Sequence, residues 1–105
     1  MSFGCALYLN GGPFSCGCDI KIYENGIDII NCLSMPMYKL QRDQIIKIIK
    51  YNKNQTIFNI EFSTAGAKKS EIIKLRISFF RRKKFIKYIE DMGYIIETRE
   101  HYKRE

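Results

Sequence analysis

The sequence predicts an α+β domain that is mainly β: a bent antiparallel sheet or partly open barrel of six to seven strands, closed by one C-terminal α-helix. Three observations support this fold class. Apolar and polar residues alternate along most of the chain before Phe79, as in strands with one buried face. Residues that favour turns separate these stretches. Apolar residues show clear helical spacing only near the C-terminus.

The length of 105 residues predicts a single domain, residues 1–105. A chain of this size can bury more than half of its unfolded surface. We expect a core unit at about 18–93 and a flexible, frayed basic tail at 99–105. No window approaches the roughly 18 apolar residues of a membrane span, and the N-terminus lacks the features of a signal peptide. We therefore expect a cytoplasmic protein.

The first third of the chain alternates strands with turns. Residues 5–9 form a weak candidate strand, and Asn10–Pro13 supply turn chemistry. Residues 18–24 form a clearer strand, which Glu24-Asn25-Gly26 turns into a tight hairpin. The returning strand, 27–33, has apolar residues at both odd-numbered and even-numbered positions, so either both of its faces are covered or it contains a bulge.

The middle of the chain is ambiguous at one stretch. Pro36 interrupts the pattern, and Tyr38–Leu40 can begin another strand. Residues 41–51 carry isoleucine pairs that suit a helix face, but their many β-branched residues suit a strand. We favour a strand because Asn52–Gln55 form a hairpin-type turn into 57–63, where apolar and polar residues alternate.

The last third changes from a strand period to a helical period. The predicted buried face of the strand consists of Ile73, Leu75, Ile77 and Phe79. From Phe80 onward the chain predicts an amphipathic helix, whose apolar arc consists of Phe85, Ile86, Ile89 and Met92. Gly93 stands where a glycine commonly ends a helix. Tyr94–Thr98 can add a little extended structure.

Positive charge is concentrated near the C-terminus. Residues 1–67 hold six cations and five acids, whereas residues 68–105 hold twelve cations and six acids. Four consecutive cations begin the predicted helix, where the helix dipole is already positive, so a bound anion would be stabilised there. The predicted anion-binding surface consists of Lys68, Lys69, Lys74, Arg76, Arg81, Arg82, Lys83 and Lys84. The alternative is a solvated face that keeps the protein soluble.

The four cysteines stand at positions 5, 16, 18 and 32. They allow a disulfide, a metal or redox site, or buried reduced thiols. The lack of a secretory signal disfavours a disulfide, and Cys16-Gly17-Cys18 lacks the spacing typical of structural zinc sites. Strand alternation favours buried thiols, since Cys18 is in phase with Ile20 and Cys5 with Leu7. We expect no metal and no cofactor.

Other candidate sites are weaker. No stretch displays a catalytic constellation, and the only histidine, His101, has no suggested Ser or Cys partner, so we expect no enzymatic activity. Tyrosines that could stack on nucleic-acid bases stand at positions 38, 51, 88, 94 and 102. None is interleaved with basic residues, which favours a packing role over base stacking. Ile57 and Ile72 stand on strands expected to be adjacent, so they form either a self-association patch or scattered exposed residues.

Three stretches resemble the pleckstrin-homology-like superfold, including its GRAM-type and small bacterial relatives. Residues 20–29, IKIYENGIDI, are similar to its opening of strand, acidic-glycine turn, isoleucine and strand. Tyr38–Ile45 resemble its third strand, and Phe85–Ile89 its closing helix. The resemblance covers about residues 18–93, without the tryptophan that many members carry in that helix. It does not extend to the phosphoinositide site of some members, since Lys21 stands alone among acidic residues.

The resemblance implies a barrel-like sheet and a non-enzymatic binding or scaffolding module. Together with the basic surface, it favours an anionic membrane surface or an acidic protein as the partner. The alternative is a small basic nucleic-acid-binding protein, whose contacts would weaken steeply with salt. Self-association is also compatible with these features.

Overall fold

The computed structural model describes residues 2–8, 15–31, 33–64 and 70–102. The strands are β1 (Ser2–Tyr8), β2 (Ser15–Tyr23), β3 (Gly26–Asn31), β4 (Pro36–Gln41), β5 (Ile45–Tyr51), β6 (Ile57–Ser63), β7 (Ser70–Arg76) and β8 (Ile96–Arg99). The helices are the 3-10 helix η2 (Arg42–Gln44) and the α-helix α1 (Phe79–Asp91). The protein is therefore α+β and mainly β, as predicted.

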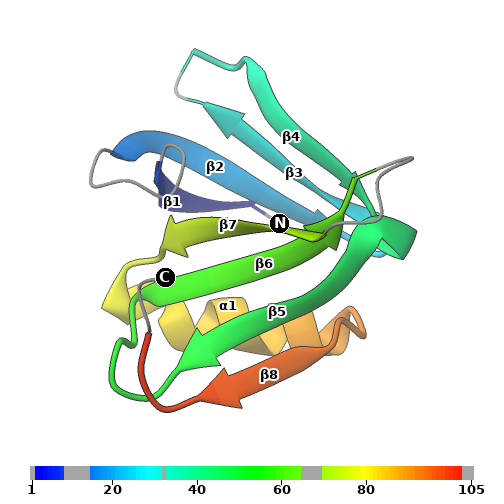
Figure 1. The fold of residues 1–105 in the computed structure, drawn as a ribbon. Coiled ribbons are helices and arrows are strands. Elements are labelled where there is room, and N and C mark those ends of the chain that lie inside the picture. The colour runs from blue at the N-terminus through cyan, green and yellow to red at the C-terminus, as the bar shows by residue number, and fades with distance from the viewer. Residues whose placement is uncertain (1, 9–14, 32, 65–69, 103–105) are drawn as a thin grey trace.

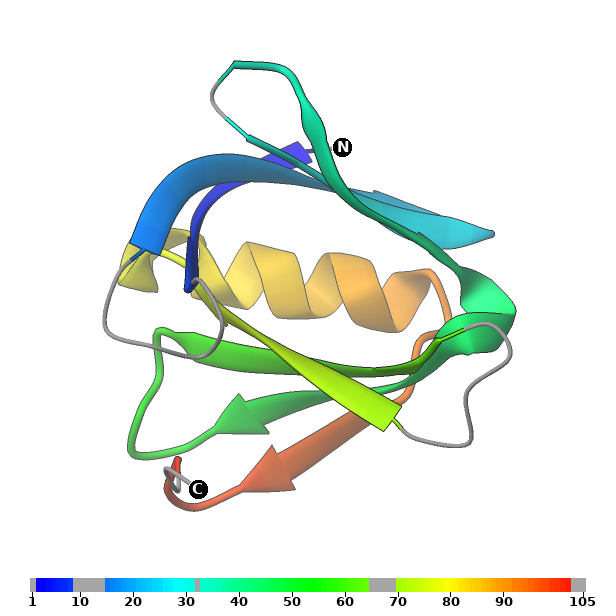
Figure 2. The ribbon, with the colours of Figure 1, turned by 45° about the horizontal axis from the view of Figure 1, so that its top comes forward.

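The strands form one sheet in the order β4-β3-β2-β1-β7-β6-β5-β8. This sheet bends until its two halves face each other, and α1 runs between them (Figures 1 and 2). The two edge strands, β4 and β8, do not pair in the described part of the chain, so the sheet is not closed into a barrel. The bent sheet with one C-terminal helix confirms the coarse prediction.

The strand count and the strand directions differ from the prediction. The described residues hold eight strands, not six to seven, because residues 96–99 form a complete strand. Strand β8 pairs with β5 in parallel, which makes the sheet mixed rather than antiparallel. The reason is that α1 returns the chain to the other end of the sheet after β7, so that the next strand runs in the same direction as β7.

The core lies on the concave side of the sheet. Phe85 of α1 packs edge-to-face on Phe3 of β1 and on Phe58 of β6, with ring centroids 5.2 and 4.9 Å apart. Ile86 and Ile89 are buried beside it, which confirms the predicted apolar arc of the helix, and Met92 packs against the same core. One side of α1 therefore binds both halves of the sheet together.

Strand β7 ends earlier than predicted. Ile73, Leu75 and Ile77 are buried as expected, but Phe79 is 60% exposed and begins α1. Ser78, a residue type favoured at the N-cap, precedes it. Since α1 starts at Phe79, this side chain leaves the buried face that the strand period assigned to it.

The first hairpin confirms the predicted tight turn. Tyr23 pairs with Gly26, which leaves Glu24 and Asn25 as the turn residues. A Cβ atom at Gly26 would lie 2.4 Å from the carbonyl oxygen of Leu40, so the close approach of β4 requires glycine there. The register with β4 shifts between Ile29 and Ile30, and the extra residue of this bulge, Met37, belongs to β4. Strand β3 pairs regularly with β2, so Ile30 lies opposite Asp19 on the other face from Ile29 and is only partly buried.

Residues 41–51 form a strand only in part. Gln41 ends β4, η2 follows, and β5 begins at Ile45. The backbone N–H of Gln41 donates to Oε1 of Gln44 at 2.9 Å, which closes the turn that reverses the chain. The β5–β6 hairpin that we expected after Tyr51 is confirmed.

Arg42 joins η2 to the end of α1. Its guanidinium donates to three backbone carbonyls, those of Glu24, Met92 and Gly93, at 2.7, 2.8 and 2.8 Å. The same group lies 4.4 Å from the ring centroid of Tyr94. Gly93 has φ +83°, which confirms its predicted place after the helix. Because carbonyls at a helix C-terminus carry partial negative charge, a cation stabilises this end.

The chain ends are tied to the sheet. Strand β1 lies between β2 and β7, so the sheet extends outside residues 18–93. We expected fraying from Arg99 onward, but Arg99 belongs to β8, and the backbone N–H of Tyr102 donates to Oδ1 of Asn54 at 2.8 Å. Residues 103–105 lie outside the described part of the chain.

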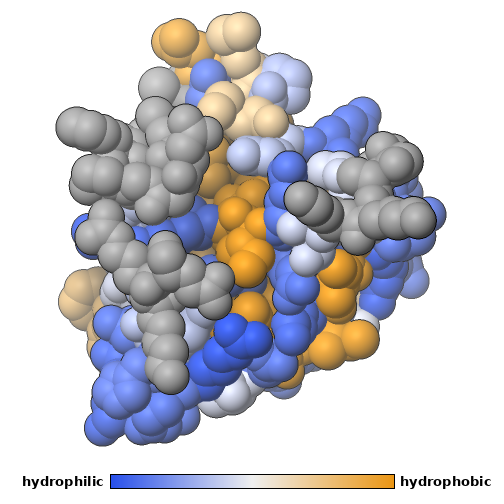
Figure 3. All heavy atoms as spheres, viewed as in Figure 1, coloured by the Kyte–Doolittle hydropathy of each residue, from blue (hydrophilic) through white to orange (hydrophobic). Residues whose placement is uncertain are grey.

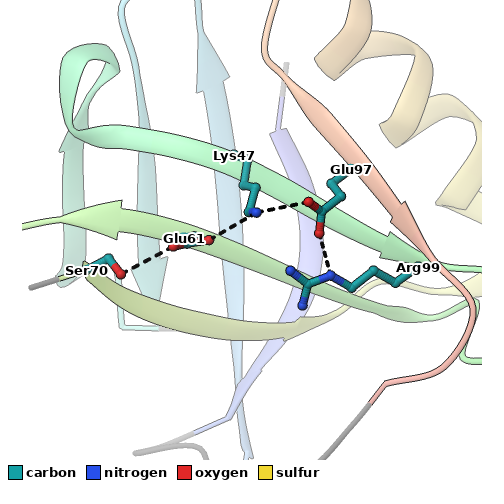
Figure 4. Close-up of polar contacts among 5 residues, drawn as sticks. All are labelled: Lys47, Glu61, Ser70, Glu97 and Arg99. Atoms are coloured by element: carbon teal, nitrogen blue, oxygen red, sulfur yellow. Dashed lines mark hydrogen bonds and ion pairs between the residues drawn. The ribbon is translucent and has the colours of Figure 1, made fainter.

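Ion pairs on the convex face hold β8 in place (Figure 4). Lys47 Nζ lies 3.0 Å from Oε1 of Glu97 and 3.7 Å from Oε2 of Glu61. Glu97 also pairs with Arg99, and Ser70 donates to Glu61 at 3.3 Å. The hydrogen bond from Lys47, together with Arg99, lowers the pKa of Glu97 below its ordinary value of 4.5. The carboxylate of Glu97 is therefore the charge that links β8 to β5.

Candidate anion-binding site

A cleft of about 670 Å³ lies on the convex face of the sheet, at the end where β7 leads into α1. We call it the cationic cleft. Its lining consists of Tyr8, Asn52, Lys53, Asn54, Gln55, Thr56, Ile57, Lys74, Arg76 and Tyr102. These residues come from the end of β1, the β5–β6 turn, the start of β6, β7 and the segment after β8. The surface over the β5–β6 turn is hydrophilic (Figure 3).

Strand β7 places two of the predicted cations in the cleft. Its apolar residues Ile73 and Leu75 point into the core, so Lys74 and Arg76 project from the convex face. The register sets Arg76 opposite Ile57 of β6, which also lines the cleft. The alternation that we used to predict the strand therefore accounts for the position of both cations.

Two tyrosine rings flank Lys74. Its Nζ atom lies 4.2 Å from the ring centroid of Tyr8 and 4.5 Å from that of Tyr102. Arg76 lies 5.8 Å from the Tyr8 centroid. Each such contact contributes about 0.5–1 kcal/mol at exposed sites, and it leaves the charge of the cation in place. The two rings therefore help to orient Lys74.

The cleft has an excess of positive charge. Its described lining holds three cations, Lys53, Lys74 and Arg76, and no carboxylate. Lys53 pairs with Glu100 at 4.0 Å, but both side chains are more than half exposed, so this pair is weak. The amide side chains of the β5–β6 turn add neutral hydrogen-bonding groups. This combination suits a small anionic group.

Tyr102 is positioned by a second aromatic contact. Its ring lies edge-on to Tyr51, with centroids 5.6 Å apart, and Tyr51 is buried. Burial raises the pKa of Tyr51, although the nearby Arg99 opposes this shift.

Asn59 stands at a polar position of the alternating stretch 57–63, but it is also buried, on the convex side of the sheet. Within the described residues, its Oδ1 atom has no hydrogen-bond partner.

The start of α1 presents apolar rings among cations. Phe80 is 92% exposed, and its ring lies 6.2 Å from that of Phe79, which is also exposed. The cations Arg81, Lys83 and Lys84 in the first two turns of the helix are exposed as well. We call these five residues the helix-start patch. The first turn holds no acidic residue, so the helix dipole and the side chains both present positive charge here.

Arg82 has a structural role instead. Its Nε donates to the carbonyl of Gln55 at 2.8 Å, and one terminal nitrogen lies 3.4 Å from the carbonyl of Tyr51. Next to it, the backbone N–H of Ile77 donates to the carbonyl of Thr56 at 2.8 Å. These bonds hold the β5–β6 turn against the start of α1, so the cationic cleft and the helix-start patch share one end of the molecule (Figure 1).

The predicted site residues thus divide into groups. Lys74 and Arg76 line the cleft, Arg81, Lys83 and Lys84 belong to the patch, and Arg82 supports the turn. Lys68 and Lys69 lie outside the described residues. Ser70, which follows them, begins β7, and a strand of this length places it about 20 Å from Arg76.

Sequence reasoning missed five residues of this end. Tyr8, Lys53 and Tyr102 reach the cleft from distant parts of the chain, and no local pattern marks them. Phe79 was missed because strand alternation was extended one residue too far, and Phe80 was assigned to the helix but not to its exposed surface. Ser78 before a run of helix-compatible residues is an N-cap signal that could have separated Phe79 from the strand.

The predicted pair of convex-face isoleucines does not form one patch. Ile57 lies opposite Arg76, whereas Ile72 lies opposite Glu61. Strands β6 and β7 are adjacent as expected, but the two isoleucines stand near opposite ends of the pairing. Apolar side chains with a higher exposed fraction, including Leu33 and Met35, lie between β3 and β4, and Figure 3 shows apolar surface at this hairpin tip.

Comparison with models of protein families and with curated proteins gives no match to this chain. Among the residues that the structure describes, no helix is both long enough and apolar enough to cross a membrane.

Proposed function

We propose that the protein is a cytoplasmic, non-enzymatic binding module with a pleckstrin-homology-like architecture, and that it docks on an anionic membrane surface. The run of seven antiparallel strands before the closing helix supports this architecture. The observation that carries the functional proposal is the exposure of Phe80 among the cations of the helix-start patch. Exposed apolar groups rimmed by polar residues commonly mark interaction sites.

A bilayer surface suits this combination of groups. Complete burial of a phenylalanine side chain contributes about 1.5–3 kcal/mol, and each Lys or Arg near an anionic membrane contributes about 1 kcal/mol. Phe80 with Arg81, Lys83 and Lys84 therefore provides roughly 4–6 kcal/mol. This corresponds to a dissociation constant between about 1 mM and some tens of micromolar, that is, weak and reversible binding.

The cationic cleft adds an anion site at the same end. Lys74 is already oriented by Tyr8 and Tyr102, so little side-chain freedom is lost when an anion binds. With the helix-start patch at the bilayer, the neighbouring cleft is available to a negatively charged headgroup. A bilayer also accepts the two phenylalanine rings without the matching pocket that a folded protein partner would need.

Vesicle binding tests the proposal. Co-sedimentation would compare vesicles of phosphatidylcholine alone with vesicles that also contain phosphatidylserine, across a salt series. We expect binding only to the anionic vesicles and a loss with salt. Phe80→Ser and Lys84→Glu should each weaken binding at least fivefold.

Two matched controls use residues far from the patch. Leu33→Ser removes an apolar side chain that is 75% exposed, and Lys39→Glu reverses an exposed charge on β4. Both should bind vesicles like the wild-type protein. Equal losses in the patch variants and the controls, or no preference for anionic vesicles, would contradict the proposal.

One contact favours a second function, the binding of single-stranded nucleic acid. In the fold, Lys74 lies between the rings of Tyr8 and Tyr102, although the tyrosines are not interleaved with basic residues along the sequence. Bases can stack on aromatic side chains beside cations. Fluorescence anisotropy with labelled oligonucleotides would test it. Binding tighter than that to vesicles, sensitive to Tyr102→Ala but not to Phe80→Ser, would favour nucleic acid.

A further inference from the structure

Two cysteine side chains meet between β1 and β2. Cys5 and Cys18 stand directly opposite each other in the antiparallel register, and their Sγ atoms lie 3.0 Å apart. Neither sulfur atom is part of a disulfide in this structure. Cys18 belongs to the buried core, and Cys5 packs against that core while staying partly exposed. The membrane-docking function that we propose uses neither thiol.

The backbone geometry allows a covalent bond between them. Opposed residues of an antiparallel pair have Cα atoms about 4.5–5.5 Å apart, which lies within the range of about 4.4–6.8 Å for disulfides. Both side chains project from the concave face, in phase with Phe3 and Ile20, which are buried. The two sulfur atoms can therefore approach to bonding distance without a rearrangement of the strands.

We propose that Cys5 and Cys18 form an oxidisable thiol pair, which a hydroperoxide converts into a disulfide between β1 and β2. The half-buried Cys5 is the thiol that peroxide can reach, whereas Cys18 is only 7% exposed. The protein thus carries a site of reversible modification in addition to its membrane-docking end.

The reaction proceeds in two steps with hydrogen peroxide as the oxidant. The Cys5 thiolate attacks one peroxide oxygen, an S–O bond forms, the O–O bond breaks, and the departing hydroxide takes a proton to become water. The Cys18 thiolate then attacks the sulfenic sulfur of Cys5. The S–S bond forms, the S–O bond breaks, and a second water leaves. Two thiols are oxidised and one peroxide is reduced.

The environment of Cys18 favours its part in the second step. The hydrogen bond with Cys5 lowers the pKa of the Cys18 thiol from its ordinary value of 9.0, although burial and Asp19 oppose this shift. A lower pKa increases the fraction of thiolate, the form that attacks sulfur. This shift applies to the reduced pair, and the position of Cys18 directly opposite Cys5 makes it the resolving thiol.

Peptide mapping tests the pair directly. The reduced protein would be treated with hydrogen peroxide, blocked with an alkylating reagent, and cleaved by a protease that cuts after aromatic residues. Cleavage after Tyr8 and Phe14 separates Cys5 from Cys18, so a disulfide joins two peptides. Because Cys16 and Cys18 share the second peptide, fragment ions from cleavage between them in tandem mass spectrometry assign the link to one of the two. We expect a Cys5–Cys18 link that dithiothreitol reverses. A link from Cys5 to Cys16 or Cys32, or no link at all, would overturn the proposal.

Variants provide a second measurement. In the double variant Cys16→Ser, Cys32→Ser, one equivalent of peroxide should remove both remaining thiols and raise the Tm by about 5–15 °C, since the bond cross-links the unfolded chain. With Cys18→Ser added, the Cys5 sulfenic acid should persist and react with dimedone. With Cys5→Ser added instead, dimedone labelling should fall at least tenfold. Equal labelling of the two triple variants would refute the assignment of Cys5 as the first thiol.

Discussion

Replacement of Arg42 by methionine should destabilise the protein strongly, since this side chain joins three separate segments. Its guanidinium makes three hydrogen bonds of 2.7–2.8 Å to backbone carbonyls. At about 1 kcal/mol net for each bond, with about 0.5–1 kcal/mol for the contact with Tyr94, the total is roughly 3–4 kcal/mol. Methionine retains the packing of the aliphatic stem, and water can solvate the exposed carbonyls. The expected loss is therefore about 2–3 kcal/mol.

Urea denaturation followed by circular dichroism would measure this loss. With a slope of about 1–3 kcal/mol per molar urea, the midpoint should fall by about 0.7–3 M. Arg42→Lys should lie between the wild type and Arg42→Met, because lysine keeps the charge at the helix end but loses the fork of donors. Arg81→Met is the control. Arg81 is exposed, and its guanidinium carbon lies 5.5 Å from the centroid of the Phe3 ring, so this variant also removes a contact between an arginine and an aromatic ring. Equal midpoints for Arg42→Met and Arg81→Met would refute the argument.

Two further predictions concern Arg82 and Glu97. Arg82→Met should lower the free energy of unfolding by about 1 kcal/mol, whereas Lys83→Met should leave it unchanged. Vesicle binding should be weakened less by Arg82→Met than by Lys83→Met. The reverse order of the two losses in vesicle binding would mean that Arg82 contacts the membrane. Because the folded-state pKa of Glu97 is lowered, its ion pairs stabilise the protein fully above its ordinary value of 4.5 and are lost as the pH falls through the folded-state pKa. The urea midpoint of Glu97→Gln should therefore lie below that of the wild type at pH 7, and the gap should narrow in acid; a gap independent of pH would contradict this.

The parts of the fold that could be predicted are those in which one face of an element is buried. In β6, Phe58, Ile60 and Phe62 are buried, and their spacing alone predicted the strand. In α1, the spacing of the buried residues likewise predicted the helix. Strand β8 was underestimated because it has only four residues, none fully buried, and exists through its pairing with β5. Pairing of this kind leaves no periodic pattern of apolar residues in the local sequence, so the strand could not be predicted from it.

The candidate site could be predicted only for cations on regular elements. Lys74 alternates with buried neighbours, so its position on the convex face follows from the strand period. The part played by Arg82 could not be predicted, since its partners are backbone carbonyls of a turn far along the chain. Tyr8 and Tyr102 meet Lys74 only because the topology brings the end of β1 and the segment after β8 to the same end of the sheet.

The two edge strands of the sheet bear on the strength of the membrane docking that we propose. Strand β4 begins with Pro36, which has no N–H to donate to an added strand, and β8 is short and carries Glu97 and Arg99. Such margins are poor templates for joining two copies edge to edge. A single copy offers one contact with a bilayer and gains no avidity from a second. In the membrane docking that we propose, residence at the bilayer should therefore be brief, and the occupied fraction should follow local lipid charge closely.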